Sequence, residues 1–196
     1  MKFSERGKNI YFSQLYEEDS WFHLPYWESD VRHNGCGLIS LAMCIDLLTG
    51  RDLTPTDVYN IRKEAGLDQL NVANAEATSV CGGDVTLRLN DMNRKLFGIE
   101  SRRMERTVEA FREVLERDSV IWASSRGCDF LNMLGDCWYK PDGHIIVFWR
   151  YEDGIFYAKD CDYNSSVGCD IPYTEVELQQ WLDGYTRQQF EITLSE

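Results

Sequence analysis

The feature that most constrains this chain is an apolar run, residues 38–48, that directly follows Asn34-Gly35-Cys36-Gly37. The run predicts a helix, and Cys36 then stands in its first turn. Unpaired backbone N–H groups and the positive end of the helix dipole stabilise a thiolate over a thiol. Such a position lowers a cysteine pKa from its usual value of about 8.5. The sequence therefore indicates a nucleophile at Cys36.

Two glycines flank this cysteine. Gly35 allows unusual backbone angles where the chain enters the helix, and Gly37 leaves space beside the sulfur for a substrate backbone. The alternative is that Cys36 is a small buried residue, since cysteine is among the most buried residue types. A partner residue is needed to distinguish a catalytic thiol from a buried one.

The composition predicts one domain that spans residues 1–196. The chain is 43% hydrophobic and 13% aromatic, which suffices for a sizeable core, and it holds no linker, repeat or low-complexity tract. Residues 11–34 are rich in aromatic and turn residues. We therefore expect residues 1–34 to form an ordered N-terminal arm that packs on the domain.

The formal net charge is -13, from 20 Lys and Arg against 33 Asp and Glu. This charge disfavours nucleic acids and anionic membranes as partners, and it suits a basic peptide or protein substrate. The N-terminal residues lack an apolar signal core, and no stretch is long and uncharged enough to cross a bilayer. We therefore expect a cytoplasmic protein.

The cysteines form an odd set without a Cys-x-x-Cys pair or zinc-finger spacing, so we predict no metal site and no cofactor. Two spacings could close small disulfide loops, but we expect reduced thiols in a chain without an export signal. The seven cysteines are Cys36, Cys44, Cys81, Cys128, Cys137, Cys161 and Cys169.

Helical patterns follow the Cys36 helix. Thr54, Pro55 and Asp57 provide a cap, a first-turn proline and a capping-box acid for a helix that runs to about Ala65. Three further helices are expected: one that opens after Cys81-Gly82-Gly83-Asp84 and closes at Gly98, an exposed amphipathic one around residues 108–115, and one from the capping box at residues 174–177 to about Leu182.

The second half of the chain carries the signals of strands. Residues 119–124 and 144–151 are β-rich, and the latter join residues 155–158 through a hairpin turn at Glu152-Asp153-Gly154. A last strand is expected at residues 189–194. Helices first and an antiparallel sheet later make an α+β domain.

His144 is the histidine best placed to serve Cys36. It begins the strongest strand of the chain, so its ring is held rigidly at the rim of the sheet. The hairpin returns the end of the next strand, at Asp160, to the same rim. A carboxylate there can fix the tautomer of the imidazole and stabilise its protonated form. The residues thus predict a triad of Cys36, His144 and Asp160.

Other residues could fill these roles. His23 and His33 are the remaining histidines, and His33 lies near the thiol in sequence. Asp162 competes with Asp160 for the role of the acid. His144 and Asp160 could also be strand-end residues without a catalytic role.

Several motifs between about Tyr11 and Leu182 occur in a characteristic order: Tyr11-Phe12-Ser13-Gln14, Trp21, Leu24-Pro25-Tyr26, Gly35-Cys36-Gly37, Ser40-Leu41-Ala42-Met43, Gly143-His144-Ile145-Ile146-Val147, Lys159-Asp160, and a closing helix from Thr174. In order and spacing they resemble the papain-like cysteine peptidases related to the bacteriocin-processing, double-glycine-leader peptidases, in particular their free-standing relatives. Of these motifs, those around Cys36 and His144 are the ones specific to this family.

The resemblance implies a papain-like fold, in which a cysteine on a central helix faces a histidine and an aspartate on an antiparallel sheet. By analogy with the family, Cys36 is the nucleophile, His144 the acid and base, and Asp160 the orienting carboxylate. Gln14 is by the same analogy the side-chain donor of the oxyanion hole. That role requires the arm to fold back to the thiol; otherwise Gln14 is an ordinary polar residue.

The chain departs from this family at two places. Relatives commonly have Gly-Cys-Gly-Pro-Thr or Gly-Cys-Gly-Pro-Ser where this chain continues with Leu38-Ile39-Ser40, and Asp-Pro where it has Asp160-Cys161. Neither change removes a catalytic atom. The segment Arg126–Asp142, which is unusually long, could form a lid or a specificity wall before His144.

These residues and the resemblance together predict hydrolysis of amide bonds, with peptide bonds as the expected substrate. The same triad can also deamidate glutamine, transfer acyl groups or cleave isopeptides. The alternative from another class is a catalytically silent module that binds a peptide or a protein in the papain-like groove. Retention of a cysteine, a histidine and an aspartate favours the enzyme, because a binding module does not need all three.

Overall fold

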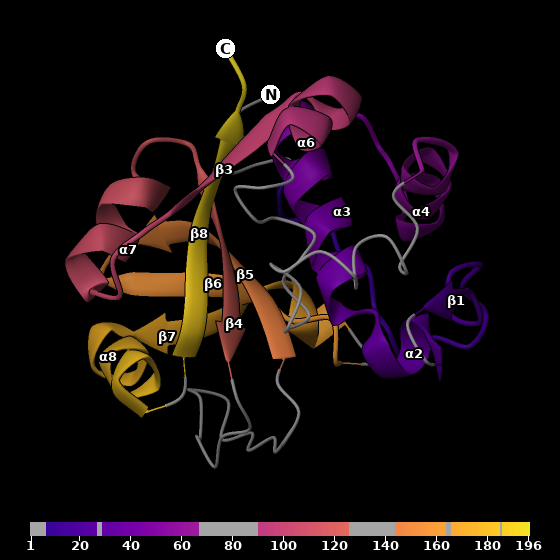
Figure 1. Ribbon diagram of the computed structural model, residues 1–196. Coiled ribbons are helices and arrows are strands. Elements are labelled where there is room, and N and C mark those ends of the chain that lie inside the picture. The colour runs from indigo at the N-terminus through magenta and orange to yellow at the C-terminus, as the bar shows by residue number, and fades with distance from the viewer. Residues whose placement is uncertain (1–6, 27–28, 67–89, 126–143, 164–165, 185) are drawn as a thin grey trace.

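The computed structural model describes residues 7–26, 29–66, 90–125, 144–163, 166–184 and 186–196 (Figure 1). Two predicted features lie outside these residues, namely the start of the helical pattern after Cys81 and the segment Arg126–Asp142. Three cysteines, Cys81, Cys128 and Cys137, also lie outside them.

A six-stranded antiparallel sheet forms the centre of the described structure. Its strands lie in the order β3-β8-β4-β5-β6-β7. The strands are β3 Ile99–Arg103, β4 Val120–Ser125, β5 His144–Glu152, β6 Ile155–Lys159, β7 Ile171–Thr174 and β8 Thr186–Leu194. All the strands predicted from the sequence are therefore confirmed.

Two strands of this sheet, β3 and β7, were not predicted, and neither was the separate two-stranded pair of β1, Pro25–Tyr26, and β2, Ser29–Asp30. β3 has the sequence Ile-Glu-Ser-Arg-Arg, with one large apolar residue, and β7 contains Pro172. Each lies at an edge of the sheet, where proline and charged side chains are tolerated. Their alternation of apolar and polar residues is too short to indicate a strand.

The β5–β6 hairpin turns at Asp153 and Gly154. Both residues have positive φ, 51° and 81°, which is the backbone of a tight hairpin turn. Glu152 pairs with Ile155, and Val147 pairs with Lys159. This register returns the end of β6 to the beginning of β5.

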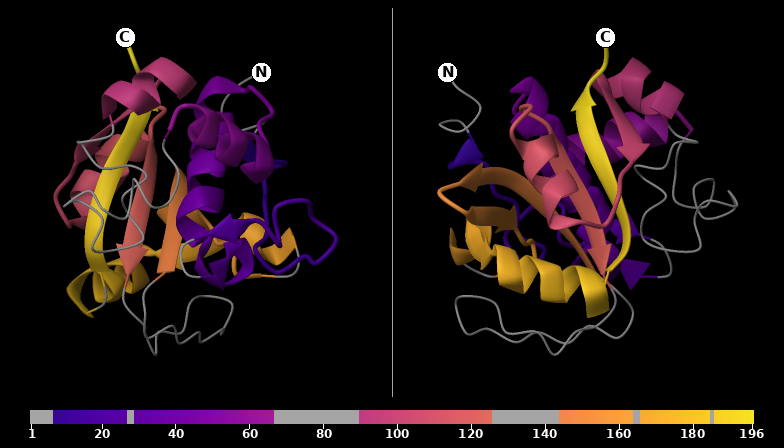
Figure 2. Two further views of the ribbon diagram at one scale, coloured as in Figure 1. Left: turned by 45° about the vertical axis from the view of Figure 1, so that its right-hand side comes forward. Right: turned by 90° about the vertical axis from the view of Figure 1, so that its left-hand side faces the viewer.

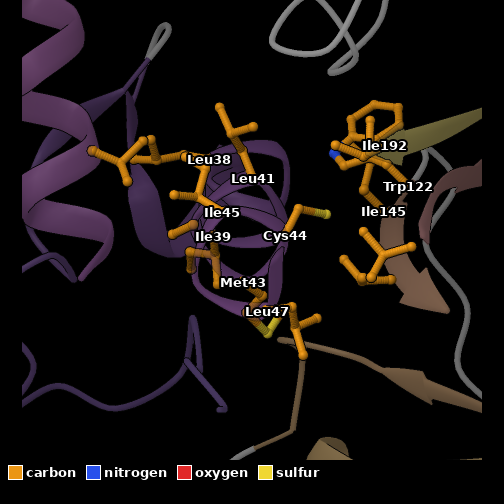
Figure 3. Close-up of a cluster of buried hydrophobic side chains, with 14 of the residues drawn as sticks. Leu38, Ile39, Leu41, Met43, Cys44, Ile45, Leu47, Trp122, Ile145 and Ile192 are labelled. Atoms are coloured by element: carbon orange, nitrogen blue, oxygen red, sulfur yellow. The ribbon is translucent and has the colours of Figure 1, made fainter. Parts of the chain in front are cut away.

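Helix α3, Cys36–Thr49, is buried on every side. Each residue from Cys36 to Leu48 is buried, and Figure 3 shows its side chains pointing outward all around the helix axis. A helix that is apolar all round is stable in water only inside a protein. None of the helices in the described ranges has both the length and the hydropathy to cross a membrane. α3 ends at Gly50, whose φ of 66° makes a left-handed C-cap.

Helices cover both faces of the sheet. In the right-hand view of Figure 2, α7, Val108–Leu115, and α8, Glu175–Gly184, lie in front of the sheet and α3 lies behind it. The amphipathic pattern predicted around residues 108–115 is α7, whose apolar side chains are buried on the sheet. The side chains of β5 alternate between the two cores: Ile145, Val147 and Trp149 face α3, whereas Ile146 and Phe148 face α7 and α8.

The remaining described elements are short. The helix predicted from Thr54 is α4, and the helical pattern that closes at Gly98 ends as α6. These remaining elements are β1 Pro25–Tyr26, β2 Ser29–Asp30, α2 Val31–Asn34, α4 Pro55–Glu64, α6 Asn90–Phe97 and the 3-10 helix η3 Ser166–Cys169. Both predicted capping boxes, at Thr54 and at Thr174, are present.

Residues 7–26 pack through apolar side chains and through a buried amine. Ile10 and Trp21 are buried in the core around α3, and Trp21 Nε1 donates to the carbonyl oxygen of Ser13 at 2.8 Å. Lys159 Nζ, at the end of β6, donates to the carbonyl oxygen of Gly7 at 2.7 Å. Burial lowers the pKa of Lys159. That the domain spans residues 1–196 stays a prediction.

Removal of the α4 cap tests one local source of stability. Thr54 Oγ1 accepts from the backbone N–H of Asp57 at 3.2 Å and donates to Asp57 Oδ2 at 2.6 Å. We expect Thr54→Val to lower the free energy of unfolding by about 1 kcal/mol at neutral pH, measured by urea denaturation. Thr193→Val is the control, because within the described residues the Thr193 hydroxyl makes no hydrogen bond.

The cost of Thr54→Val should shrink in acid. Hydrogen bonds from Thr54 hold the pKa of Asp57 below its ordinary value. The resulting stability is present above the pKa of the unfolded chain, about 4, and is lost as the pH falls through the lower folded value. A difference between variant and wild type that stays constant through the acid range would contradict this account.

Candidate active site

Cys36 is the first residue of α3, and Gly35 is its N-cap. The short helix α2 leads into α3, because the N–H of Gly35 donates to the carbonyl oxygen of Val31 at 2.8 Å. The side chain of Cys36 is 5% exposed. The thiol therefore lies at the positive end of a buried helix dipole, as the sequence predicted.

The backbone of Gly35 corrects one expectation. Its φ of −84° and ψ of 2° are open to any residue, so the prediction of unusual backbone angles is wrong. Space is what requires a glycine here. A Cβ atom at Gly35 would lie 2.4 Å from the carbonyl oxygen of Val31 and 2.8 Å from its Cα atom.

Cys36 lies on the row of α3 that meets the sheet. Residues four apart share a helix face, so Cys36, Ser40 and Cys44 form one row. Ser40 Oγ donates to the carbonyl oxygen of Ile145 at 3.3 Å, and Cys44 points toward Trp122 and Ile145 (Figure 3). This row brings the first turns of α3 to the start of β5, where His144 lies.

His144 and Asp160 form a buried hydrogen-bonded pair. His144 Nε2 donates to Asp160 Oδ1 at 2.5 Å, and neither side chain is accessible to solvent. The backbone N–H of Asp162 donates to the same oxygen at 2.9 Å. A carboxylate only accepts, so Nε2 carries the proton of a neutral ring and Nδ1 has the basic lone pair. The carboxylate that meets His144 thus belongs to Asp160, whereas Asp162 contributes its backbone.

The backbone of Asp160 is held from two sides. Its N–H donates to the carbonyl oxygen of Gly168 at 2.8 Å, and its carbonyl oxygen accepts from the Tyr11 hydroxyl at 2.9 Å. Burial raises the pKa of Tyr11, so the hydroxyl remains a donor at neutral pH. These bonds fix where the Asp160 carboxylate can point.

Gln14 lies between the start of α3 and the loop that carries Asp160. Its Nε2 donates to the carbonyl oxygen of Arg32 at 2.6 Å, and its Oε1 accepts from Cys161 Sγ at 3.3 Å. Arg32 belongs to α2, which leads directly into α3. The Gln14 amide nitrogen therefore lies close to the N-terminus of α3. The arm does fold back toward the thiol.

The other histidines do not enter this cluster. The side chain of His33 is 58% exposed, and its Nδ1 lies 2.7 Å from Asp30 Oδ1. The ring of His23 packs edge-on against Phe22, with 4.7 Å between centroids. Among the described residues, His144 is the histidine that meets a buried carboxylate.

One group of side chains could hold a metal ion. His144, Asp160 and Cys161 offer ligand atoms that lie within 4.8 Å of one another, and no other such group of three occurs among the residues that the structure describes. His144 Nε2 and Asp160 Oδ1 share a hydrogen bond, so a cation bound through these two atoms would have to replace it. That the site needs no metal stays a prediction.

The four cysteines within the described ranges, Cys36, Cys44, Cys161 and Cys169, form no disulfide. Cys44 is completely buried, and burial raises the pKa of its thiol. Cys36 and Cys44 are therefore two thiols on one helix row in different settings, one at the N-terminus of the helix and one in the middle of the core.

A pocket of about 420 Å³ lies on the other face of the sheet, between α7 and the strands β3 and β8. Buried Glu191 pairs there with Arg102 at 2.5 Å and with Arg117 at 3.2 Å. The charged residues of the lining are three arginines and three glutamates, so their charges balance. The pocket holds none of the predicted site residues.

At the level of sequence, the chain matches no protein-family model and no curated protein. Among solved structures it is similar to the crystal structure of a candidate C39-like peptidase from Bacillus anthracis, with a TM-score of 0.50 and 14% identity over 95% of each chain. The chain thus has the α+β, papain-like fold of a C39-like peptidase, the bacteriocin-processing group that its motifs resemble. The predicted fold class and resemblance are confirmed. At this identity the likeness is one of fold.

A methyl group at Gly35 tests the tight start of α3. The backbone of Val31 or of Gly35 has to move to accept it. We expect Gly35→Ala to lower the free energy of unfolding by about 1–3 kcal/mol. We also expect slower alkylation of Cys36 by iodoacetamide, because the thiol shifts from the helix end.

Gly184→Ala is the matched control, since a Cβ atom there has no neighbour within 4 Å. Urea denaturation and peptide mapping of the alkylated thiol measure both effects. A Gly35→Ala chain with the stability and the thiol reactivity of the wild type would show that the close approach to Val31 is unimportant.

Proposed function

We propose that this chain is a thiol hydrolase that cleaves amide bonds in peptides, with Cys36 as nucleophile, His144 as acid and base, and Asp160 as the orienting carboxylate. The observation that carries the proposal is the buried His144–Asp160 hydrogen bond of 2.5 Å at the start of β5, against which the first turns of α3 pack. Burying an ionisable pair is costly unless it is fully bonded. A chemical role accounts for keeping such a pair beside a helix-terminal thiol.

In the first half of the proposed reaction, Cys36 becomes acylated by the substrate with the help of His144 and Asp160. His144 Nδ1 takes the proton of Cys36, and the thiolate sulfur attacks the substrate carbonyl carbon. The electron pair of the carbonyl moves to its oxygen, which accepts hydrogen bonds from the Cys36 backbone N–H and from Gln14 Nε2. His144 then returns the proton to the leaving amine as the C–N bond breaks. Asp160 stabilises the imidazolium through Nε2.

Deacylation repeats these steps with water. His144 Nδ1 removes a proton from a water molecule, whose oxygen attacks the thioester carbon. The C–S bond breaks and Cys36 leaves as a thiolate. No step requires a metal ion or a cofactor.

The charge of the chain supports basic substrates. With 33 acidic against 20 basic residues, its field attracts cationic peptides and repels anionic ones, which affects the rate of encounter more than the chemistry. We therefore propose peptides rich in lysine and arginine as the preferred class.

Cleavage of a diverse peptide library, followed by mass spectrometry, tests the proposed activity. We expect Cys36→Ala and His144→Ala to abolish cleavage, and Asp160→Asn to slow it by about 10²- to 10⁴-fold because the imidazolium loses the negative charge that stabilises it. Cys44→Ala is the matched control. It removes a thiol from the same row of α3 and should leave cleavage intact.

Each rival function gives a different product. A deamidase converts glutamine to glutamate without shortening the peptide, and an acyltransferase forms product only when an acceptor amine is added. If the chain is a silent binding module, the wild type and Cys36→Ala bind peptides equally well, and neither forms a product. Cleavage that survives Cys36→Ala would contradict the proposed nucleophile.

A further inference from the structure

Cys161 adds a second thiol to the cluster around His144 and Asp160. It directly follows Asp160, its side chain is fully buried, and its sulfur lies within 4.8 Å of ligand atoms of both residues. Its Sγ donates to Gln14 Oε1 at 3.3 Å. The mechanism proposed above uses neither this thiol nor its hydrogen bond.

The partners of Gln14 favour one orientation of its side-chain amide. An amide can turn over and exchange its oxygen and its nitrogen, and Gln14 is 1% exposed, so both ends meet protein atoms. The carbonyl oxygen of Arg32 can only accept, and it lies 2.6 Å from Nε2. The thiol of Cys161 meets Oε1 as a donor, whereas a reversed amide would find only a weak acceptor in its sulfur. Both partners therefore select the same orientation.

This orientation suits an oxyanion donor. One hydrogen of Nε2 goes to Arg32, and the second can serve an oxyanion that forms beside the N-terminus of α3. The reversed amide would place Oε1 against the carbonyl oxygen of Arg32 and toward the developing negative charge. Both contacts would be repulsive.

We propose that Cys161 is a positioning residue, whose thiol holds the Gln14 amide with Nε2 directed to the N-terminus of α3. This inference rests on the proposed function, in which Gln14 is the oxyanion donor. The thiol is separable from the docking of the segment itself. The backbone N–H of Gln14 donates to the carbonyl oxygen of Cys161 at 2.8 Å, and Ser13 Oγ donates to that of Tyr163 at 2.7 Å. Neither bond involves the sulfur.

Two reactions of Cys36 separate the orientation of the amide from the reactivity of the thiol. Acylation by p-nitrophenyl acetate passes through an oxyanion, whereas alkylation by iodoacetamide does not. We expect Cys161→Ala to slow acylation of Cys36 by about 10- to 100-fold and to change alkylation by less than about twofold. Peptide mapping assigns each product to Cys36 and separates it from reaction at the other thiols.

Three variants show whether the thiol acts through Gln14. Cys161→Ser keeps a donor at this place and should restore most of the acylation rate. Gln14→Ala should slow acylation at least as much as Cys161→Ala, and the double variant should be no slower than Gln14→Ala. If Cys161→Ala does not fold, as judged by circular dichroism, Cys161→Val takes its place.

Four outcomes would each overturn this inference. Cys161→Ala could acylate at the wild-type rate, or it could lose acylation and alkylation equally. Cys161→Ser could fail to restore the acylation rate, or the double variant could be slower than Gln14→Ala by the further factor seen in Cys161→Ala. Failure of the proposed function gives a separate result. In that case Cys36 of the wild type reacts with both reagents no faster than Cys44 does.

Discussion

The packing of α3 against β5 determines both the stability of the core and the geometry of the candidate site. α3 is buried on every side and largely apolar, so it can exist as a helix in water only when protein surrounds it. On one side α3 packs against the sheet, through Trp122, Ile145 and Val147. The same contact sets the position of Cys36 relative to the start of β5. The Cys36 thiol, at the end of this buried helix, is therefore held by the whole core rather than by a local loop.

A second set of contacts joins the N-terminal segment to the loop after β6. Tyr11, Ser13 and Gln14 all bond to residues 160–163, through hydroxyl, backbone and side-chain groups. The carboxylate that meets His144 and the amide beside the start of α3 therefore belong to one hydrogen-bonded unit. Because buried polar groups are costly to leave unbonded, this unit is expected to form or break as a whole.

The sequence was most informative where the relevant geometry is local. The meeting of His144 and Asp160 was predicted from a single hairpin, whose turn residues and apolar strands determine the register. The capping boxes of α4 and α8 likewise depend on residues three apart in the chain. Fold class followed from the order of these elements and from the resemblance to a family.

Features that depend on distant parts of the chain were not predictable from patterns. β3 and β7 became strands because β8 and β6 pair with them, although their own sequences are polar or contain proline. Gln14 was placed near the thiol by resemblance alone, since its partners Arg32 and Cys161 lie far away in sequence. The need for glycine at Gly35 was predicted, but its reason was wrong, because close packing against Val31 cannot be inferred from composition.

The position of β8 in the sheet bears on how the chain is made. β8 is the last strand in the sequence, yet it lies between β3 and β4 and pairs with both. While a ribosome is still adding residues 186–194, β3 has no neighbour in the sheet and β4 has one open edge. The core around α3 includes Phe190 and Ile192 of β8, so it closes only when synthesis reaches this strand. Cys36, whose helix this core surrounds, therefore reaches its final position only after the last strand of the sheet has been synthesised.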